Sequence, residues 1–253
     1  RKNETIYVTK EAGKVNDQTV SVWINADDKV NLKDKSNLKD IKDLETDEAI
    51  KSNGGYINLK SDSKDVYYQG KTDSKLPVDI NVKYYLDGKE ISFEELDGKS
   101  GHLKITIDAV NNKSADTKVD GTNKKLYSPY VVLAEANFDD DKVSNITTNS
   151  GKVVKDGKNN IVAGVLTPGL RENLEGTVDE DKLDKFKSQL EIEMDVKEYE
   201  PTEVYALISN EFFQDEANID SLDKLRDGIG ELEDNAVKLV DASEQLSAGG
   251  KKI

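Results

Sequence analysis

The sequence has no cysteine, a single histidine and no long apolar run. The lack of cysteine excludes disulfides, thiolate metal sites and cysteine nucleophiles. The longest apolar runs, at residues 130–134 and 161–166, are far shorter than the roughly 20 residues that a membrane-spanning helix requires. We therefore expect no membrane-spanning segment within these 253 residues.

The only histidine, His102, follows Gly101 at the start of a predicted strand. A Ser-His-Asp triad would have to be built around it, and the sequence contains no Gly-x-Ser-x-Gly nucleophile elbow. The Gly-Lys-Ser-Gly segment at 98–101 lacks the upstream glycine and the spacing of a phosphate-binding loop, and a turn explains it. The sequence therefore predicts a protein that is not an enzyme and that uses no cofactor.

Acidic residues outnumber basic ones by 51 to 36, which gives a formal net charge of −15. Such a charge repels phosphate backbones, so nucleic acid is not an expected partner. The acidity is typical of a solvated surface that keeps molecules apart. Asp139, Asp140 and Asp141 place oxygens close together in an expected loop, without the spacing of an EF-hand. They are candidates for calcium ligands beside the simpler interpretation of a solvated acidic turn.

Apolar and polar residues alternate over short stretches from Thr5 to about Ser209, which is the period of strands with one exposed face. Asp-Gly pairs between these stretches supply the positive φ of tight turns. The pattern predicts a mainly β protein with antiparallel sheets. The predicted strands cover residues 5–8, 19–24, 78–86, 102–110, 130–136, 161–166, 190–196 and 204–208.

Short helical turns are expected at 37–44 and at 92–96, where Ser92 and Glu95 have the spacing of a capping box. The turn at 92–96 joins two strongly patterned strands. This arrangement suits the connection between the two sheets of an immunoglobulin-like sandwich. We therefore expect one or more antiparallel, immunoglobulin-like sandwich units.

The length suggests more than one folded unit. We expect a β-rich unit at 1–112 and a second at 124–210, which is alternatively a continuation of the first. The polar segment 111–123 is either a linker between units or a long hairpin, and we favour the linker. A further boundary is expected at 210–218, before a helix at 219–253.

Apolar residues in this last segment recur at the a and d positions of a heptad. The pattern predicts the start of a helical stalk. The residues expected to pack it are Leu222, Leu225, Ile229, Leu232, Leu239 and Leu246.

The heptad pattern weakens toward its end, where Ser243 and Gly250 occupy a positions. Glycines also lie three residues after Leu225 and Leu246 and are poor helix formers. The helix should therefore need a partner, either a returning helix of the same chain or another subunit.

Five aromatic residues are the candidates for a sugar-binding cleft: Trp23, Tyr67, Tyr68, Tyr84 and Tyr85. A glycosidase would need such a cleft beside a pair of carboxylates. Tyrosines in strands more often pack across strands. A carbohydrate-active enzyme and a calcium-stiffened domain are therefore the less favoured interpretations.

A leucine with a small residue three positions later resembles the X-X-X-Leu-X-X-Gly repeats of the phage-infection-protein family (Pip/YhgE-like) and of related clostridial surface proteins. Residues 225–228 and 246–249 fit the repeat fully, whereas Asn235 and Ala242 replace two of its glycines. Upstream stretches look like the β-rich segment that precedes such repeats. These stretches are 64–70, 76–78, 84–92, 98–101, 149–153 and 168–170.

The resemblance implies export, a stalk outside the cell, and anchoring through segments beyond this chain. It also implies a role as a phage receptor or a secretion-linked scaffold. Because the chain begins at Arg1 and ends at Ile253 within the repeat, we expect it to belong to a longer protein.

Together these observations predict a non-catalytic interaction, adhesion or receptor module on the surface of a Gram-positive bacterium. The expected partner is a protein or a cell-wall glycan. The alternative is a spacer or assembly component that self-associates through the stalk helix.

Overall fold

The computed structural model describes residues 2–11, 14–119, 121–215 and 219–249, with side chains for 2–9, 17–119, 121–215 and 219–238. These residues confirm a mainly β protein with antiparallel sheets and a C-terminal helix. All eight strands predicted from the alternating pattern are present. No helix among the described residues is both long and apolar enough to cross a membrane.

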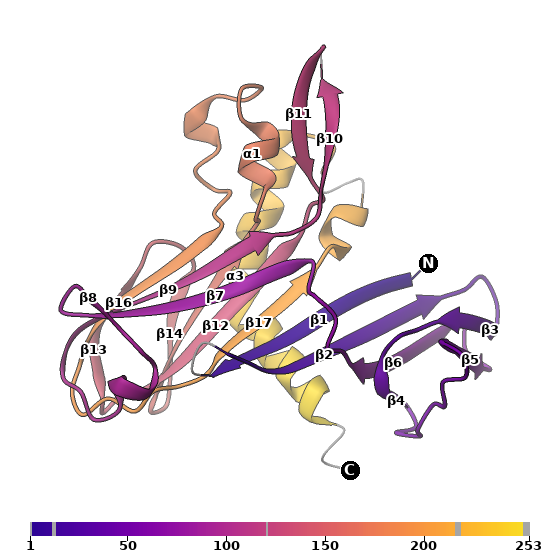
Figure 1. Ribbon diagram of the computed structural model, residues 1–253, viewed down its shortest axis with the longest axis horizontal. Coiled ribbons are helices and arrows are strands. Elements are labelled where there is room, and N and C mark those ends of the chain that lie inside the picture. Colours follow the sequence, from indigo (N-terminus) through magenta and orange to yellow (C-terminus); the bar gives the residue numbers. More distant parts are fainter. Residues whose placement is uncertain (1, 12–13, 120, 216–218, 250–253) are drawn as a thin grey trace.

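Two large sheets dominate the molecule (Figure 1). In spatial order the eight-stranded sheet contains β14 (Lys152–Asp156), β15 (Asn159–Leu166), β12 (Val131–Asp139), β17 (Val204–Ser209), β1 (Lys2–Glu11), β2 (Lys14–Asn25), β6 (Asp65–Lys71) and β4 (Lys39–Asp43). The five-stranded sheet contains β13 (Val143–Thr148), β16 (Gln189–Val196), β9 (Gly101–Asn111), β7 (Val78–Leu86) and β8 (Lys89–Ile91).

The other described elements are two small two-stranded sheets and several helices. The small sheets are β3 (Val30–Lys35) with β5 (Tyr56–Ser61), and the hairpin of β10 (Ser114–Val119) with β11 (Thr122–Tyr127). The helices are η1 (Glu94–Leu96), α1 (Leu170–Leu174), η2 (Glu180–Lys182), η3 (Glu211–Gln214) and α3 (Leu222–Gly249).

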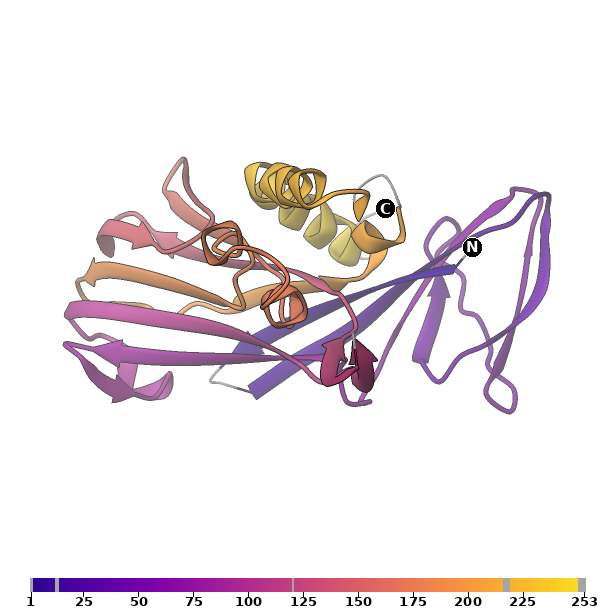
Figure 2. The ribbon, with the colours of Figure 1, turned by 90° about the horizontal axis from the view of Figure 1, so that it is seen from above.

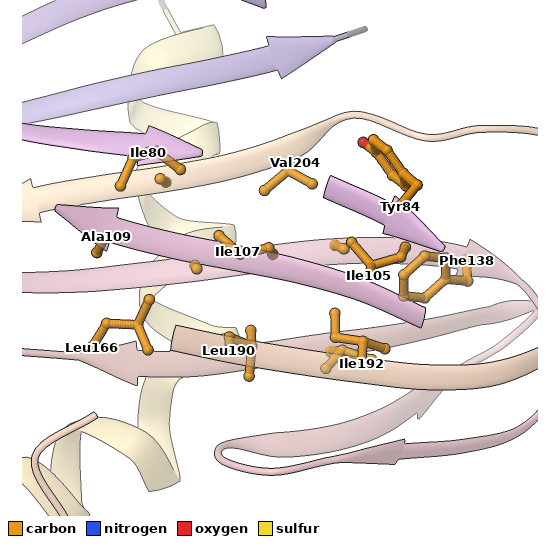
Figure 3. Close-up of a cluster of buried hydrophobic side chains, with 14 of the residues drawn as sticks. Ile80, Tyr84, Ile105, Ile107, Ala109, Phe138, Leu166, Leu190, Ile192 and Val204 are labelled. Carbon is orange, nitrogen blue, oxygen red and sulfur yellow. The ribbon is translucent and has the colours of Figure 1, made fainter. Parts of the chain in front are cut away.

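The main core lies between the two large sheets (Figure 3). Every second residue of β9 faces this core, because successive side chains of a strand point to opposite faces. Ile105 and Ile107 are almost completely buried there, and Phe138 and Ala134 of β12 face the same core from the other sheet. The alternation read from the sequence thus reports which side of each strand is covered.

The strands β12 and β15 are buried on both faces. Val131 and Val165 point away from the main core into a second cluster, which α3 covers. Figure 2 shows α3 lying along one side of the sheets. The protein therefore has a third layer, and the continuous apolar runs of β12 and β15 follow from it.

The described part of α3 corrects the expectation of a stalk that leads away from the β region. Leu225 and Ile229 are buried against the sheet, at 8% and 1% exposure. Gly228 allows close packing, since a Cβ there would lie 2.7 Å from the Phe212 ring. The described part of the helix packs against the sheet of its own chain, which offers the apolar face that a second helix was expected to supply.

The ranges 1–112 and 124–210 share both large sheets. β1 pairs with β17, with Ile6 opposite Ile208, and β9 pairs with β16. Pairing of this kind favours the alternative of one continuous unit. The preference for a linker at 111–123 is wrong, because β10 and β11 form a hairpin there that projects from the molecule (Figure 1).

Two expectations about helical turns have different outcomes. At 92–96 the capping box is confirmed: the Glu95 N–H donates to Ser92 Oγ at 3.3 Å, and the Ser92 N–H donates to Glu95 Oε2 at 3.2 Å. However, this turn joins β8 to β9 of one sheet, so it does not connect the two sheets. At 37–44 the structure has the strand β4 instead of a helical turn, because its backbone pairs with β6.

A second lobe extends the eight-stranded sheet beyond the sandwich, where the two-stranded β3–β5 sheet lies near β2, β6 and β4 (Figure 1). Tyr68 is fully buried in its core. The Tyr68 hydroxyl donates to Asp34 Oδ2 at 2.6 Å, and Lys2 Nζ lies 2.8 Å from the same oxygen. These contacts join the β3–β5 sheet to the large sheet.

Candidate functional site

The outer face of the five-stranded sheet carries a ladder of polar side chains. In β9, Leu103, Ile105 and Ile107 face the core, so the residues between them point outward. The outward polar residues of β9 that line the groove are His102, Lys104, Thr106 and Asp108. The outward residues of β16 are Gln189, Glu191, Glu193 and Asp195.

Lys83 and Tyr85 of β7 continue this face on the other side of β9. The three strands line an open groove of about 580 Å³. We call it the β9 groove. Its lining residues are Lys83, Tyr85, Gly88, His102, Lys104, Thr106, Asp108, Gln189, Glu191 and Glu193.

Cross-strand contacts hold the polar groups of the β9 groove in place. Lys104 Nζ lies 2.6 Å from Glu191 Oε2. Gln189 Nε2 donates to Asp108 Oδ1 at 2.6 Å. These pairs fix the direction in which the remaining lone pairs and N–H groups point, so a ligand meets an arranged set of donors and acceptors.

His102 lies at one end of the groove between two carboxylates. Its Nδ1 is 3.1 Å from Asp195 Oδ1, and its Nε2 is 3.3 Å from Glu193 Oε2. Hydrogen bonds with Asp195 and then Glu193 raise the pKa of His102 above its usual value. The pKa of Asp195 is lowered by hydrogen bonds from Asn145 and His102. The imidazole therefore gains a proton more readily than it would in an isolated peptide.

The groove suits a ligand with many hydroxyl groups. Carboxylates and Gln189 accept hydrogen bonds, and Lys83, Lys104 and Gln189 donate them. Tyr85 adds a ring that can pack on the apolar face of a sugar. Charged acceptors, donors and one tyrosine ring thus lie together on a single sheet face.

The three candidate calcium ligands lie at the end of β12, which includes Asp139, and in the turn that follows it. Asp139 Oδ1 accepts a hydrogen bond from the N–H of Asp141 at 2.9 Å. Asp140 Oδ2 lies 2.6 Å from Lys155 Nζ, and its other oxygen accepts from Asn160 at 3.0 Å. Lys155 and then Asn160 lower the pKa of Asp140.

These contacts shape the turn and hold it to β14 and β15. Across the described residues, no three His, Cys, Asp or Glu side chains come together closely enough to hold a metal ion.

The six residues expected to pack the stalk differ in burial, and the side chains of four of them are described. Leu225 and Ile229 are buried between the helix and the sheet, and Leu222 and Leu232 are partly buried beside them. The side chains of Leu239 and Leu246 lie outside the described residues. The four described side chains therefore form part of the helix–sheet core.

The five aromatic residues considered for sugar binding lie in three different parts of the structure. Tyr68 and Tyr84 are buried in the hydrophobic cores. Trp23 and Tyr67 stack on each other across β2 and β6, with ring centroids 6.3 Å apart. Tyr85 alone among the five lines the β9 groove.

The groove could not be predicted from the residues taken one at a time, because it forms only when β9 and β16 pair. The signal was present as two polar runs at every second position, from His102 to Asp108 and from Gln189 to Asp195. What the sequence does not contain is the antiparallel register that places Asp195 opposite His102 and Gln189 opposite Asp108.

Comparison with known proteins gives a remote structural likeness and no match to a family. No protein-family model matches the chain, and neither does the sequence of any curated protein. Among solved structures, the chain is similar to the isomalto-dextranase of Arthrobacter globiformis T6 in complex with panose, at 9% identity and a TM-score of 0.18. The match covers 78% of this chain and 35% of the enzyme, and at this TM-score it carries no argument about fold or function.

Proposed function

We propose that this protein is a non-catalytic binding module that binds a cell-wall glycan in the β9 groove. The observation that supports it is the row of outward donors and acceptors on β9 and β16, held by cross-strand contacts such as Lys104 with Glu191 at 2.6 Å. Groups that are already oriented lose little conformational entropy on binding. A polysaccharide laid along the groove would meet several of them at once.

Electrostatics favour binding over glycoside cleavage. A glycosidase needs one carboxylic acid with a raised pKa to protonate the leaving group. Beside the groove, the hydrogen bonds from Asn145 and His102 lower the pKa of Asp195. They stabilise the charged form of this carboxylate, which suits an acceptor of hydroxyl hydrogen bonds.

The cellular setting is part of the same proposal. On the resemblance to the phage-infection-protein family, the module belongs to the extracellular surface of a Gram-positive bacterium, anchored by segments outside this chain. A phage receptor or other adhesion role would use the same exposed groove. The immunoglobulin-like class of the sandwich and the heptad character of the helix stay predictions.

The alternative of assembly through the heptad helix has less support. Leu225 and Ile229, two of its expected packing residues, are covered by the sheet of the same chain. A second helix could reach them only by displacing this layer. Assembly through the helix is therefore a proposal about the last heptads alone.

A pelleting assay with purified Gram-positive cell wall tests the proposed binding. Replacing Tyr85 with alanine removes the one aromatic side chain of the groove and should weaken binding by at least about tenfold. The matched control is Tyr56→Ala, because Tyr56 is 42% exposed on β5, outside the groove. If the wild-type chain stays in the supernatant, or if the two variants bind equally weakly, the proposal is wrong.

A further inference from the structure

The four outer edges of the two large sheets differ in how well they are protected. An exposed edge strand can pair with another chain, and bulges or short length prevent this. The pairing of β4 with β6 and that of β13 with β16 both contain a register shift. The edge strand β8 has three residues. By contrast, β14 pairs with β15 over five consecutive residues without a shift.

The side chains of β14 also leave it open to pairing. Val153 and Val154 are adjacent, so their side chains point to opposite faces of the strand. Both are nevertheless exposed, at 40% and 37%. Lysine on an edge usually discourages pairing. Here Lys152 lies 2.8 Å from Asp234 and Lys155 lies 2.6 Å from Asp140, so contacts within the chain offset both charges.

We propose that β14 is a self-association edge, at which two copies of this chain pair antiparallel with Val154 opposite its own counterpart. In this register the two ends of β14 have opposite charges that can pair. Lys152 of each copy faces Asp156 of the other, and Val153 faces Lys155. Such two-fold, isologous contacts are the commonest form of soluble homodimer.

Pairing at this edge would join the two eight-stranded sheets into one continuous sheet. The backbone groups of β14 that point away from β15 would gain partners, and the exposed valines would meet the other copy. The inference is independent of glycan binding, because β14 contributes no residue to the β9 groove.

Cross-linking through a single introduced cysteine tests the register. Since the chain contains no cysteine, the variant Val154→Cys carries one thiol per copy. Residues directly opposite in an antiparallel pair have Cβ atoms about 4.5–5.5 Å apart, close to the separation that a disulfide bridges. Under mild oxidation this variant should form a covalent dimer rapidly.

The matched control is Val110→Cys. Val110 is 46% exposed on β9, and β9 is a central strand of the five-stranded sheet, with β16 on one side and β7 on the other. Its dimer should form only at the rate of random collision. Equal cross-linking rates for the two variants would overturn the proposal.

The mass in solution gives a second, independent reading. Sedimentation of the wild-type chain over about a hundredfold range of concentration should show a monomer–dimer equilibrium. Val154→Lys places two ammonium groups against each other on the two-fold axis and should shift the chain to monomer, while its circular dichroism stays unchanged. A wild-type chain that is monomeric throughout, or a dimer that survives Val154→Lys, contradicts pairing at β14.

Discussion

The Glu233 carboxylate on α3 accepts a hydrogen bond from the backbone N–H of Gly151 at 2.6 Å. The same oxygen accepts from Ser150 Oγ at 3.1 Å, and Lys185 forms an ion pair with the other oxygen. Only 16% of the Glu233 side chain is exposed. One carboxylate thus joins the helix, the turn before β14 and the segment before β16.

Replacing Glu233 with glutamine should destabilise the fold by about 1–3 kcal/mol, because Lys185 loses its charged partner in a partly buried site. Burial alone would raise the pKa of Glu233, but hydrogen bonds from Lys185 and Gly151 hold it below its ordinary value of 4.5. Its stabilising contribution is therefore present above pH 4.5 and is lost as the pH falls through the lowered pKa.

Urea unfolding of the wild type and of Glu233→Gln at neutral and acidic pH measures this contribution. The two proteins should differ at neutral pH and converge in acid. A constant difference across the range would show that the glutamate acts through packing instead of charge.

Gly151 should tolerate no side chain. Its φ is +80°, and a Cβ would lie 2.1 Å from the carbonyl oxygen of Ala163 on β15. Gly151→Ala should therefore cost more than about 2 kcal/mol, from backbone strain and a forced shift of the strand. Gly157→Ala is the control, since Gly157 has φ +60° with open space around it. If the melting temperatures of the two variants fall by the same amount, the close contact at Gly151 is contradicted.

The position of α3 against the sheet predicts a large effect at Ile229. Its side chain is 1% exposed within the helix–sheet core, so Ile229→Ala should cost about 2–5 kcal/mol. Glu231→Ala on the exposed side of the same helix should change stability little. If denaturant midpoints of the two variants agree, the helix does not pack on the sheet in solution.

The single histidine makes the electrostatics of the groove measurable. Hydrogen bonds with Asp195 and Glu193 raise the pKa of His102 above 6.5. The stabilisation by these pairs is therefore complete below pH 6.5 and is lost as the pH rises through the raised pKa. The effect on stability should be small because all three side chains are well exposed.

An NMR titration of the imidazole should give a midpoint above 6.5 in the wild type and a lower midpoint in Asp195→Asn. A midpoint that is the same in both proteins would mean that the imidazole and Asp195 do not pair in solution.

Local pattern was enough to predict most of the central strands, since burial on one face leaves a period of two in the sequence. It was also enough for the capping box at Ser92 and Glu95 and for the helix after Leu222. The strand β4 does not show a clear alternation in the sequence, because its pairing with β6 contains a register shift.

Contacts between distant segments were not predictable in the same way. Leu225 and Ile229 have heptad spacing, and this spacing gives an apolar face without stating whether a helix or a sheet covers it. Likewise, His102 and Asp195 are 93 positions apart, so only the register of β9 with β16 brings them together. The candidate site depends on that register, whereas the strands on which it lies could be predicted.

The most direct test of glycan binding in the β9 groove uses the ring signals of His102, because no other histidine contributes to that region of the spectrum. Soluble cell-wall oligosaccharides would be titrated into the labelled protein at constant pH. The account predicts that the His102 signals shift and saturate, and that Tyr85→Ala weakens the response while Tyr56→Ala does not. Saturating shifts at other residues with unchanged His102 signals would place the binding site elsewhere and contradict the proposal.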